Sequence, residues 1–400
     1  MADTELLNEL AYKEEIRDVD YRQTVNKIGK ILGIAIIIFT VLFTMTFISL
    51  EKEFNDNIRV NFIQHSFIII VTASQLILIS AGLTLTARVR KFSNFAHAEF
   101  VTVGIYTAIA LNQMLGRESS FLQWLFVEIL IVFIITGFVG ILMEVLVFTP
   151  LEKRDGTALS LMVASIGVGL VIRQIIQEIF SGSNQSAPPY YPDFFSKLSN
   201  IPVLEIFFAK RSVFHLTDMI TLRISRDEAW SILVMVITVY MLNYIFTKTI
   251  LGISMRATAD DAELAQISGI NTKRVIYWTW FIAGGITGVG ALFFLESATV
   301  IPFSGFFALL IIFAVVTLGG FDSFEGTLIS AFIISIAMTS SVIINQILVN
   351  YEEDSTTVDK LVFWNATGDW KLATPFAVII GVLFIRPRGI YGLVDPRSKL

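Results

Sequence analysis

Side chains able to do chemistry are few in this sequence and scattered along it. Cysteine is absent, which excludes disulfides and thiolate metal sites. The histidines His65, His97 and His215 lie far apart, and neither an HExxH motif nor a GxSxG elbow is present. A GxxxxGK(S/T) phosphate loop is missing as well, so we do not expect the chain to hydrolyse ATP. We therefore predict no catalytic residue, no metal and no cofactor held by this chain.

The ionisable side chains of most interest lie inside apolar stretches, where a charge is costly and usually has a function. Glu99 begins one such stretch, and Arg173 and Glu178 lie in another. The spacing of Arg173 and Glu178 does not place them on one helix face. We therefore expect Arg173 to reach outward to interfacial water. The other carboxylates in apolar stretches are not spaced as a proton relay would require.

The elements that hold these residues are predicted to be membrane helices. Of the 400 residues, 54% are hydrophobic and only 16% are charged, and the mean hydropathy is +0.72. A soluble domain is about 45–50% apolar and about 25% charged. The net charge of −5 provides no basic face for nucleic acid. The composition thus predicts an all-α, multi-pass membrane protein that contacts lipid and no nucleic acid.

A helix that crosses a bilayer needs about 20 mostly apolar residues. About ten segments meet this requirement, some of them broken or kinked. Lys and Arg are more frequent in the connections on the side of the N-terminus, so both termini are predicted to be cytoplasmic. Pro302 and Gly305 interrupt one span, which we expect to cross with a kink or an unwound entry rather than to re-enter. The predicted spans are 28–50, 64–87, 95–113, 121–148, 159–180, 229–250, 274–297, 299–318, 325–348 and 373–387.

These spans divide the chain into three parts. Residues 1–63 are predicted to hold a cytoplasmic tail, an extra anchor helix and an external loop, residues 64–392 the transmembrane domain, and residues 393–400 a cytoplasmic tail. The polar insert 181–228 interrupts the transmembrane domain on the external side. A second polar stretch on that side carries a glycosylation sequon at Asn365, which suits an external face.

The most informative stretch is the cytoplasmic connection 251–274. Its apolar residues recur with a short helical period, its acids lie near the start, and Gly269 lies where a left-handed turn would end a helix. A helix that rests on anionic lipid favours a basic polar face, whereas this one is acidic, so we expect a protein partner. Ala265 is expected to face that partner. The residues expected at the contact are Met255, Arg256, Asp260, Asp261, Glu263, Ala265, Gly269 and Ile270.

The same stretch carries a family resemblance. The run ELAQISG at 263–269 resembles the EAA-x3-G loop of ABC transporter permeases, with Leu264 in place of the middle alanine. The longer run MRATADDAELAQISGINTKRVI is similar to that loop in permeases of branched-chain amino acid importers. Further stretches match this family in the same order, namely NFAHAE at 94–99, PLEKRDGTALSLMVASIGVGLVIRQII at 150–176, LGG at 318–320 and RPRGI at 386–390.

The resemblance implies a transport subunit with several partners. These are a sister permease subunit or a second copy, cytoplasmic ABC ATPases that consume the ATP, and an external substrate-binding protein. Residues 253–270 would be the coupling helix seated on an ATPase. Ala98, where the family has glycine, and Glu325, where it usually has proline, depart from the pattern.

A second group of residues is expected in the translocation path or in close helix packing. Asn94 is expected to cap a helix at its cytoplasmic start, and His97 to bond between helices. The glycines are expected to permit close approach of helices, as small residues do in lipid. The group comprises Asn94, His97, Glu99, Gly104, Tyr106, Gly284, Gly285, Gly288, Gly319 and Gly320.

We therefore expect a permease subunit of an ATP-driven importer for branched-chain amino acids or a similar small polar solute, in the plasma membrane of a prokaryote. Two alternatives remain. One is a permease of the same family for urea or short amides, and the other is a secondary transporter that works without ATP.

Overall fold

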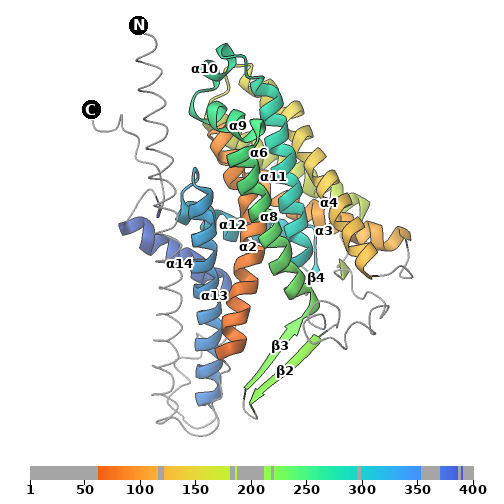
Figure 1. Cartoon of the computed structure of the whole chain (residues 1–400), viewed down its shortest axis with the longest axis vertical. Coiled ribbons are helices and arrows are strands. Elements are labelled where there is room, and N and C mark those ends of the chain that lie inside the picture. Colours follow the sequence, from red (N-terminus) through yellow and green to blue (C-terminus); the bar gives the residue numbers. More distant parts are fainter. Residues whose placement is uncertain are drawn as a thin grey trace. The chain divides into compact units, whose positions relative to one another are not determined.

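The computed structural model of the chain describes residues 62–115, 121–180, 185–186, 211–217, 220–294, 299–352, 370–385 and 389–390 (Figure 1). Apart from Phe62, all of them belong to one unit, Ile63–Leu400. The predicted helix 28–50, the tail 393–400 and the sequon at Asn365 lie outside the described residues.

Six helices in the described part of the chain are long and apolar enough to cross a bilayer. A helix suits lipid because it closes its backbone hydrogen bonds within itself. The expected helical membrane protein is thus confirmed, whereas the count of about ten spans is not. The six candidate spans are Ile63–Arg90, Leu125–Glu152, Ala158–Ile179, Arg226–Lys248, Thr272–Phe294 and Phe324–Val342.

Most of these spans correspond to single helices. The second is composite, because a π-helical turn, η2 (Glu144–Phe148), and the short helix α5 (Thr149–Glu152) extend α4 (Phe121–Met143). The others are α2 (Phe62–Arg90), α6 (Ala158–Ile179), α8 (Arg226–Lys248), α11 (Thr272–Phe294) and α13 (Phe324–Glu352).

Three helices at other predicted spans are shorter than the typical membrane span of about 20 residues. They are α3 (Glu99–Leu115) with 17 residues, and α12 (Ser304–Gly319) and α14 (Trp370–Ile385) with 16 residues each. A 3-10 turn, η1 (Phe95–Ala98), precedes α3. These helices explain why fewer spans qualify than the hydrophobic pattern alone predicted.

Two short antiparallel ladders accompany the helices. Strand β1 (Gln185–Ser186) pairs with β4 (Thr299–Val300), so the predicted span 299–318 begins as a strand. The chain then turns at Pro302, and helix begins only at Ser304, which confirms the unwound entry.

The second ladder lies in the polar insert. Strand β2 (Arg211–Thr217) pairs with β3 (Ile220–Ser225) as a hairpin. Helix α8 follows directly, because Ser225 and Glu228 form a reciprocal capping box around its first turn. The insert therefore ends at Ser225, before its predicted end at residue 228, because α8 begins at Arg226.

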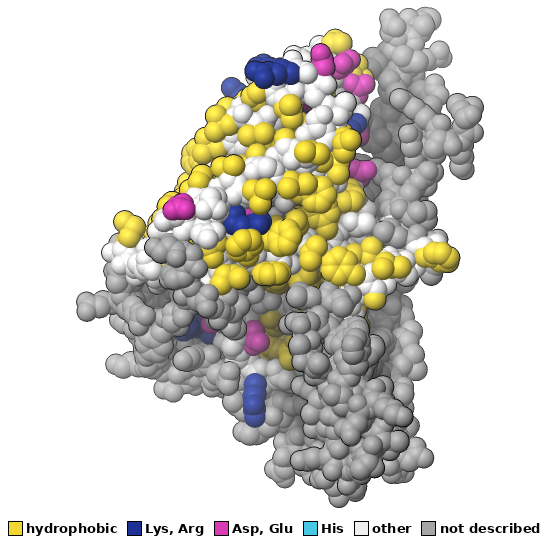
Figure 2. Space-filling model, turned by 180° about the vertical axis from the view of Figure 1, so that it is seen from behind, with side chains coloured by type: hydrophobic (Ala, Val, Ile, Leu, Met, Phe, Trp, Pro, Cys, Tyr) yellow, Lys and Arg dark blue, Asp and Glu magenta, His cyan; other side chains and the backbone are white. Residues whose placement is uncertain are grey.

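Helix α11 lies at the centre of the packing. In the most apolar windows of α11 and α2, 78% and 72% of the residues are buried, against 28% in α6 and α8. Helices α4 and α3 pack directly against α11. The outer helices therefore leave large apolar side chains exposed, as the broad hydrophobic face in Figure 2 shows. Such a surface suits lipid or a second membrane subunit.

Candidate functional site

The connection 251–274 forms two helices rather than the single one predicted. Helix α9 (Ile250–Asp260) is followed by α10 (Ala262–Ile267). Asp261 separates them, because its backbone is extended and its carboxylate accepts hydrogen bonds from the N–H groups of Glu263 and Leu264, both at 3.0 Å. This N-cap starts α10 in a new direction.

Gly269 ends α10 as the sequence predicted. Its φ is +89°, in the left-handed region. Its N–H donates to the Gln266 carbonyl at 3.0 Å, and the Ile270 N–H donates to the Ala265 carbonyl at 3.0 Å. A Cβ at this position would meet nothing within 4 Å, so backbone conformation alone explains the glycine.

The outward side of α10 agrees with the prediction only in part. Ala265, expected to face a partner, is only 4% exposed and packs within the chain, and Met255, expected on the apolar face, is buried as well. Leu264 and Ile267, which belong to the predicted apolar pattern, present side chains that are 61% and 83% exposed. The break at Asp261 sets which side of α10 packs inward, so α10 does not continue the face of α9.

Charged side chains surround this apolar pair. Asp260, Asp261 and Glu263 are exposed, as is Arg256 on α9. Figure 1 shows that α9 and α10 lie together beyond the end of α8. An apolar contact with an acidic border fits a protein surface with basic groups better than anionic lipid.

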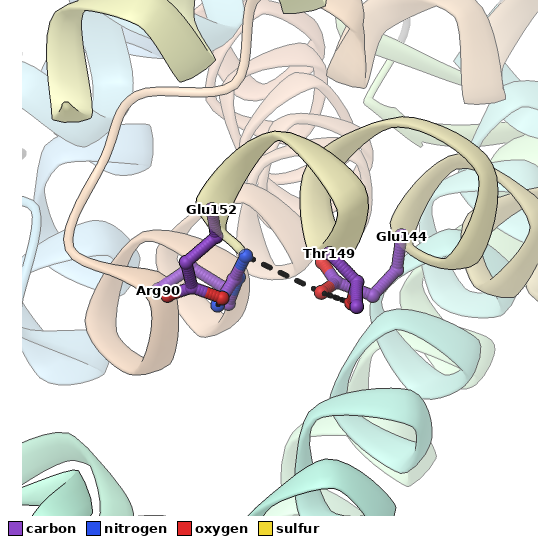
Figure 3. A network of polar contacts seen from close by, with 4 residues as sticks. All are labelled: Arg90, Glu144, Thr149 and Glu152. Atoms are coloured by element: carbon purple, nitrogen blue, oxygen red, sulfur yellow. Dashed lines mark hydrogen bonds and ion pairs between the residues drawn. The ribbon is translucent and has the colours of Figure 1, made fainter. Parts of the chain in front are cut away.

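Two adjacent basic residues connect this region to the membrane helices. The Lys91 ammonium donates to the Asp260 carbonyl at 3.3 Å. Arg90 pairs with Glu152 at 2.9 Å and with Glu144 at 3.3 Å, where Thr149 also donates to Glu144 at 2.8 Å (Figure 3). Arg90 thus joins the end of α2 to the end of the second span. Lys91, the next residue, joins it to α9.

The stretch after Lys91 returns into the helix bundle. Asn94 accepts a hydrogen bond from the Ala96 N–H at 3.0 Å, which confirms the predicted cap. The His97 Nε2 lies 3.1 Å from the Ile79 carbonyl and 3.0 Å from the Thr287 hydroxyl, so His97 bonds between helices as expected. Ile79 lies roughly 16 Å along α2 from Arg90, at 1.5 Å per residue. Asn94 and His97 therefore do not mark a cytoplasmic helix start, and α3 begins inside the bundle.

The glycines of α11 permit close helix approach, which confirms their predicted packing. A Cβ on Gly284 would lie 2.6 Å from the Thr136 carbonyl oxygen of α4, and one on Gly285 would lie 2.6 Å from the Phe133 ring. Gly288 faces Gly104 of α3, where a Cβ would lie 2.6 Å from the Gly288 carbonyl oxygen.

Gly319 and Gly320 act at the end of α12. A Cβ on Gly319 would lie 2.6 Å from the carbonyl oxygen of Gly326 at the start of α13. Gly320 ends α12 with a φ of +100°. Together they allow the tight turn between these two helices.

Glu99 and Arg173 form a buried ion pair, so the prediction that Arg173 extends outward was wrong. Glu99 is 2% exposed and Arg173 is 8% exposed, and the Arg173 Nη2 donates to the Glu99 Oε1. The Thr102 hydroxyl donates to the other carboxylate oxygen at 3.0 Å. The pair lies within the membrane domain and joins α6 to α3.

Tyr106 has a packing role. It is buried against Phe180, with ring centroids 4.7 Å apart.

Among the described residues, no group of three or more His, Cys, Asp or Glu lies close enough to hold a metal ion.

Comparison with known proteins identifies the family of this chain. Residues 65–383 match the family model described as "Branched-chain amino acid transport system / permease component". The chain is 25% identical over 81% of its length to the "Probable branched-chain amino acid transport permease protein LivH" of Methanocaldococcus jannaschii, covering 90% of that protein. It is 25% identical to the "High-affinity branched-chain amino acid transport system permease protein LivH" of Escherichia coli K12 (83% of this chain, 96% of that one). It is 24% identical to "High-affinity branched-chain amino acid transport system permease protein BraD" of Pseudomonas aeruginosa (79% and 91%). The comparison with solved structures gave no match.

Proposed function

Because this chain belongs to the family of permease components of branched-chain amino acid transport systems, we propose that it is the membrane subunit of an ATP-driven importer for branched-chain amino acids or a similar small polar solute. In this proposal it pairs with a sister permease or a second copy and receives its cargo from an external binding protein. Cytoplasmic ABC ATPases supply the energy, and the chain itself makes no chemical bond.

The exposed pair Leu264 and Ile267 is the observation that carries this proposal. A short helix capped by Asp261 and Gly269 holds both side chains away from the rest of the chain. Large apolar side chains so exposed on a polar loop suit a hydrophobic cleft in another protein. The acidic residues around them oppose burial in anionic lipid.

The contacts of α9 supply a route from this surface to the membrane domain. Helix α9 packs against α8, α10 and α11. Lys91 joins its last carbonyl to the stretch that carries Asn94 and His97. A displacement of α10 by the ATPases would then act on the start of α3 through one chain of direct contacts. Such coupling requires that the ATPases bind the two states of the permease with different affinities.

The two alternatives differ in what drives transport and in what is carried. The relatives named above are called branched-chain amino acid permeases, which favours that cargo over urea or short amides. A secondary transporter that works without ATP would have no use for an exposed apolar pair on a capped cytoplasmic helix.

The test replaces Leu264 and Ile267 together by alanine. Alanine preserves the helix and removes about three methylene equivalents from each side chain, worth about 0.8 kcal/mol per buried methylene. Loss of even a third of this free energy weakens binding by about tenfold, since 1.4 kcal/mol corresponds to a factor of ten. Capture of the ATPases by the purified chain should fall by tenfold or more, and ATP-driven uptake should fall with it.

A matched control replaces Leu159 and Val163 by alanine. These residues are exposed to a similar degree but lie on α6, outside the coupling segment 253–270. The control should bind the ATPases as the wild type does. Equal capture by the Leu264/Ile267 variant and the wild type would remove the main support for the coupling assignment.

A further inference from the structure

The buried pair of Glu99 and Arg173 is only partly satisfied within the described residues. A guanidinium has five N–H donors, of which the structure uses one toward Glu99, from Nη2. The Nε of Arg173 is buried and has no hydrogen-bond partner among the described residues. A cation with unused donors inside a membrane domain is costly and usually marks a functional site.

Aromatic rings hold this guanidinium in place. Its central carbon lies 4.9 Å from the ring centroid of Phe303 and 5.0 Å from that of Phe306, within the range of a cation–π contact. A cation–π contact acts on the charge of the group. Glu99 accepts one of the N–H donors, and Thr102 donates to the other oxygen of Glu99. The cation is therefore held in place while its Nε keeps an unused donor.

Arg173 lines a groove of about 300 Å³, with Leu170, Val171, Gln174, Gln177 and Phe303. This volume is at the lower end of the range of about 300–1,000 Å³ for small-molecule sites, which are mostly apolar with a few oriented polar groups. The groove combines an anion-binding group with walls that suit an aliphatic side chain.

We propose that this groove binds the cargo amino acid, with its α-carboxylate on the N–H edge of Arg173 and its branched side chain against Leu170, Val171 and Phe303. This inference rests on the proposed function. Gln174 donates its amide N–H to Glu178 at 3.1 Å, which leaves its amide oxygen to accept from the cargo ammonium. Arginine suits the task because its planar edge matches a carboxylate with two parallel hydrogen bonds. Glu99 balances the charge of Arg173 when the groove is empty.

The test measures binding to the assembled importer in lipid nanodiscs. The probes are leucine, 4-methylpentanoate, which keeps the carboxylate and lacks the ammonium, and leucinamide, which lacks the carboxylate. Leucine and 4-methylpentanoate should compete for the site, and leucinamide should compete at least tenfold more weakly. Equal competition by leucinamide and 4-methylpentanoate would overturn the assignment.

The variant Arg173→Lys keeps the charge but loses the planar edge. It should bind leucine at least tenfold more weakly and raise the KM of uptake. Arg226→Lys is the matched control, because Arg226 is also buried beside a carboxylate, Asp227, outside the groove; it should behave as the wild type does. Wild-type binding and uptake by Arg173→Lys would refute the proposal.

A second variant guards against misfolding of the first. Val171→Trp fills the groove from an exposed position and leaves the residues of the ion pair unchanged. It should also weaken leucine binding by tenfold or more, and unchanged binding would count against the site. Nanodiscs with and without phosphatidylglycerol separate a carboxylate site from a lipid phosphate site. Dependence of the Arg173→Lys defect on phosphatidylglycerol would assign the arginine to lipid and overturn the proposal.

The two proposals can fail separately. Absence of ATP-dependent leucine uptake by the wild-type importer, with carboxylate-selective binding retained, would refute the proposed function and leave the groove assigned. Normal ATP-dependent uptake by the wild type, with no effect of Arg173→Lys, would refute the groove assignment and leave the proposed function in place.

Discussion

The close approach of α3 and α11 at Gly104 can be tested by adding a single methyl group. In Gly104→Ala, the new Cβ would lie 2.6 Å from the Gly288 carbonyl oxygen and 2.7 Å from its Cα. Both are backbone atoms, so no rotamer change can relieve the overlap. The helices must separate, and with them the contact of α11 with α4 at Gly284 and Gly285 is disturbed.

The expected loss of stability follows from two opposing terms. Overpacking of a filled interior costs about 1–3 kcal/mol. Replacing a helical glycine by alanine gains about 0.8–1 kcal/mol. The net effect of Gly104→Ala should be a destabilisation of up to about 2 kcal/mol.

Gly167→Ala supplies the matched control. Gly167 lies in α6, and a Cβ there would meet nothing within 4 Å. This variant keeps the gain in helix propensity and has no overlap, so it should be neutral or slightly more stable. The assay is the fraction of detergent-solubilised chain that stays monodisperse after heating. Gly104→Ala should have the lower apparent Tm of the two, and a Tm at or above that of Gly167→Ala would refute the packing argument.

Three further variants test other parts of the account. Gly269→Val places a branched side chain at a φ of +89°, at a cost of about 1–2 kcal/mol, and should weaken ATPase capture. Gly269→Asn should retain ATPase capture. Equal capture by both variants would show that the cap is dispensable. Lys91→Met removes the bond to the Asp260 carbonyl, so leucine uptake should fall while ATPase capture stays normal, and loss of both would indicate a folding defect instead. His97→Ala leaves the Thr287 hydroxyl without this partner inside the bundle and should destabilise the chain by about 1–3 kcal/mol; an unchanged apparent Tm would exclude a structural role.

Features set by local chemistry could be predicted from the sequence. The membrane helices follow from runs of apolar residues, the Asn94 cap from a side chain that accepts a neighbouring N–H, and the Gly269 turn from a conformation that glycine adopts easily. The packing of the glycines in α11 is similar in kind, since small residues on one helix permit close approach whatever the neighbour.

Features set by contacts between distant residues could not be predicted. Glu99 and Arg173 are 74 positions apart, so no helical spacing relates them, and the sequence gives Arg173 only as an isolated charge. Ala265 and Met255 were expected at the outward contact together with Leu264 and Ile267 because a single helix was assumed. The break at Asp261 changes the direction of α10, which buries Ala265 and exposes Leu264 and Ile267.

ATP-dependent uptake by reconstituted vesicles distinguishes a permease driven by ABC ATPases from a transporter that works without ATP. The chain would be incorporated with its permease partner and ABC ATPases, ATP supplied on the ATPase side, and leucine with its binding protein supplied on the other. We expect leucine accumulation that requires ATP and the ATPases and that is lost when Leu264 and Ile267 are both replaced by alanine. Accumulation driven by an ion gradient in vesicles without the ATPases would contradict it.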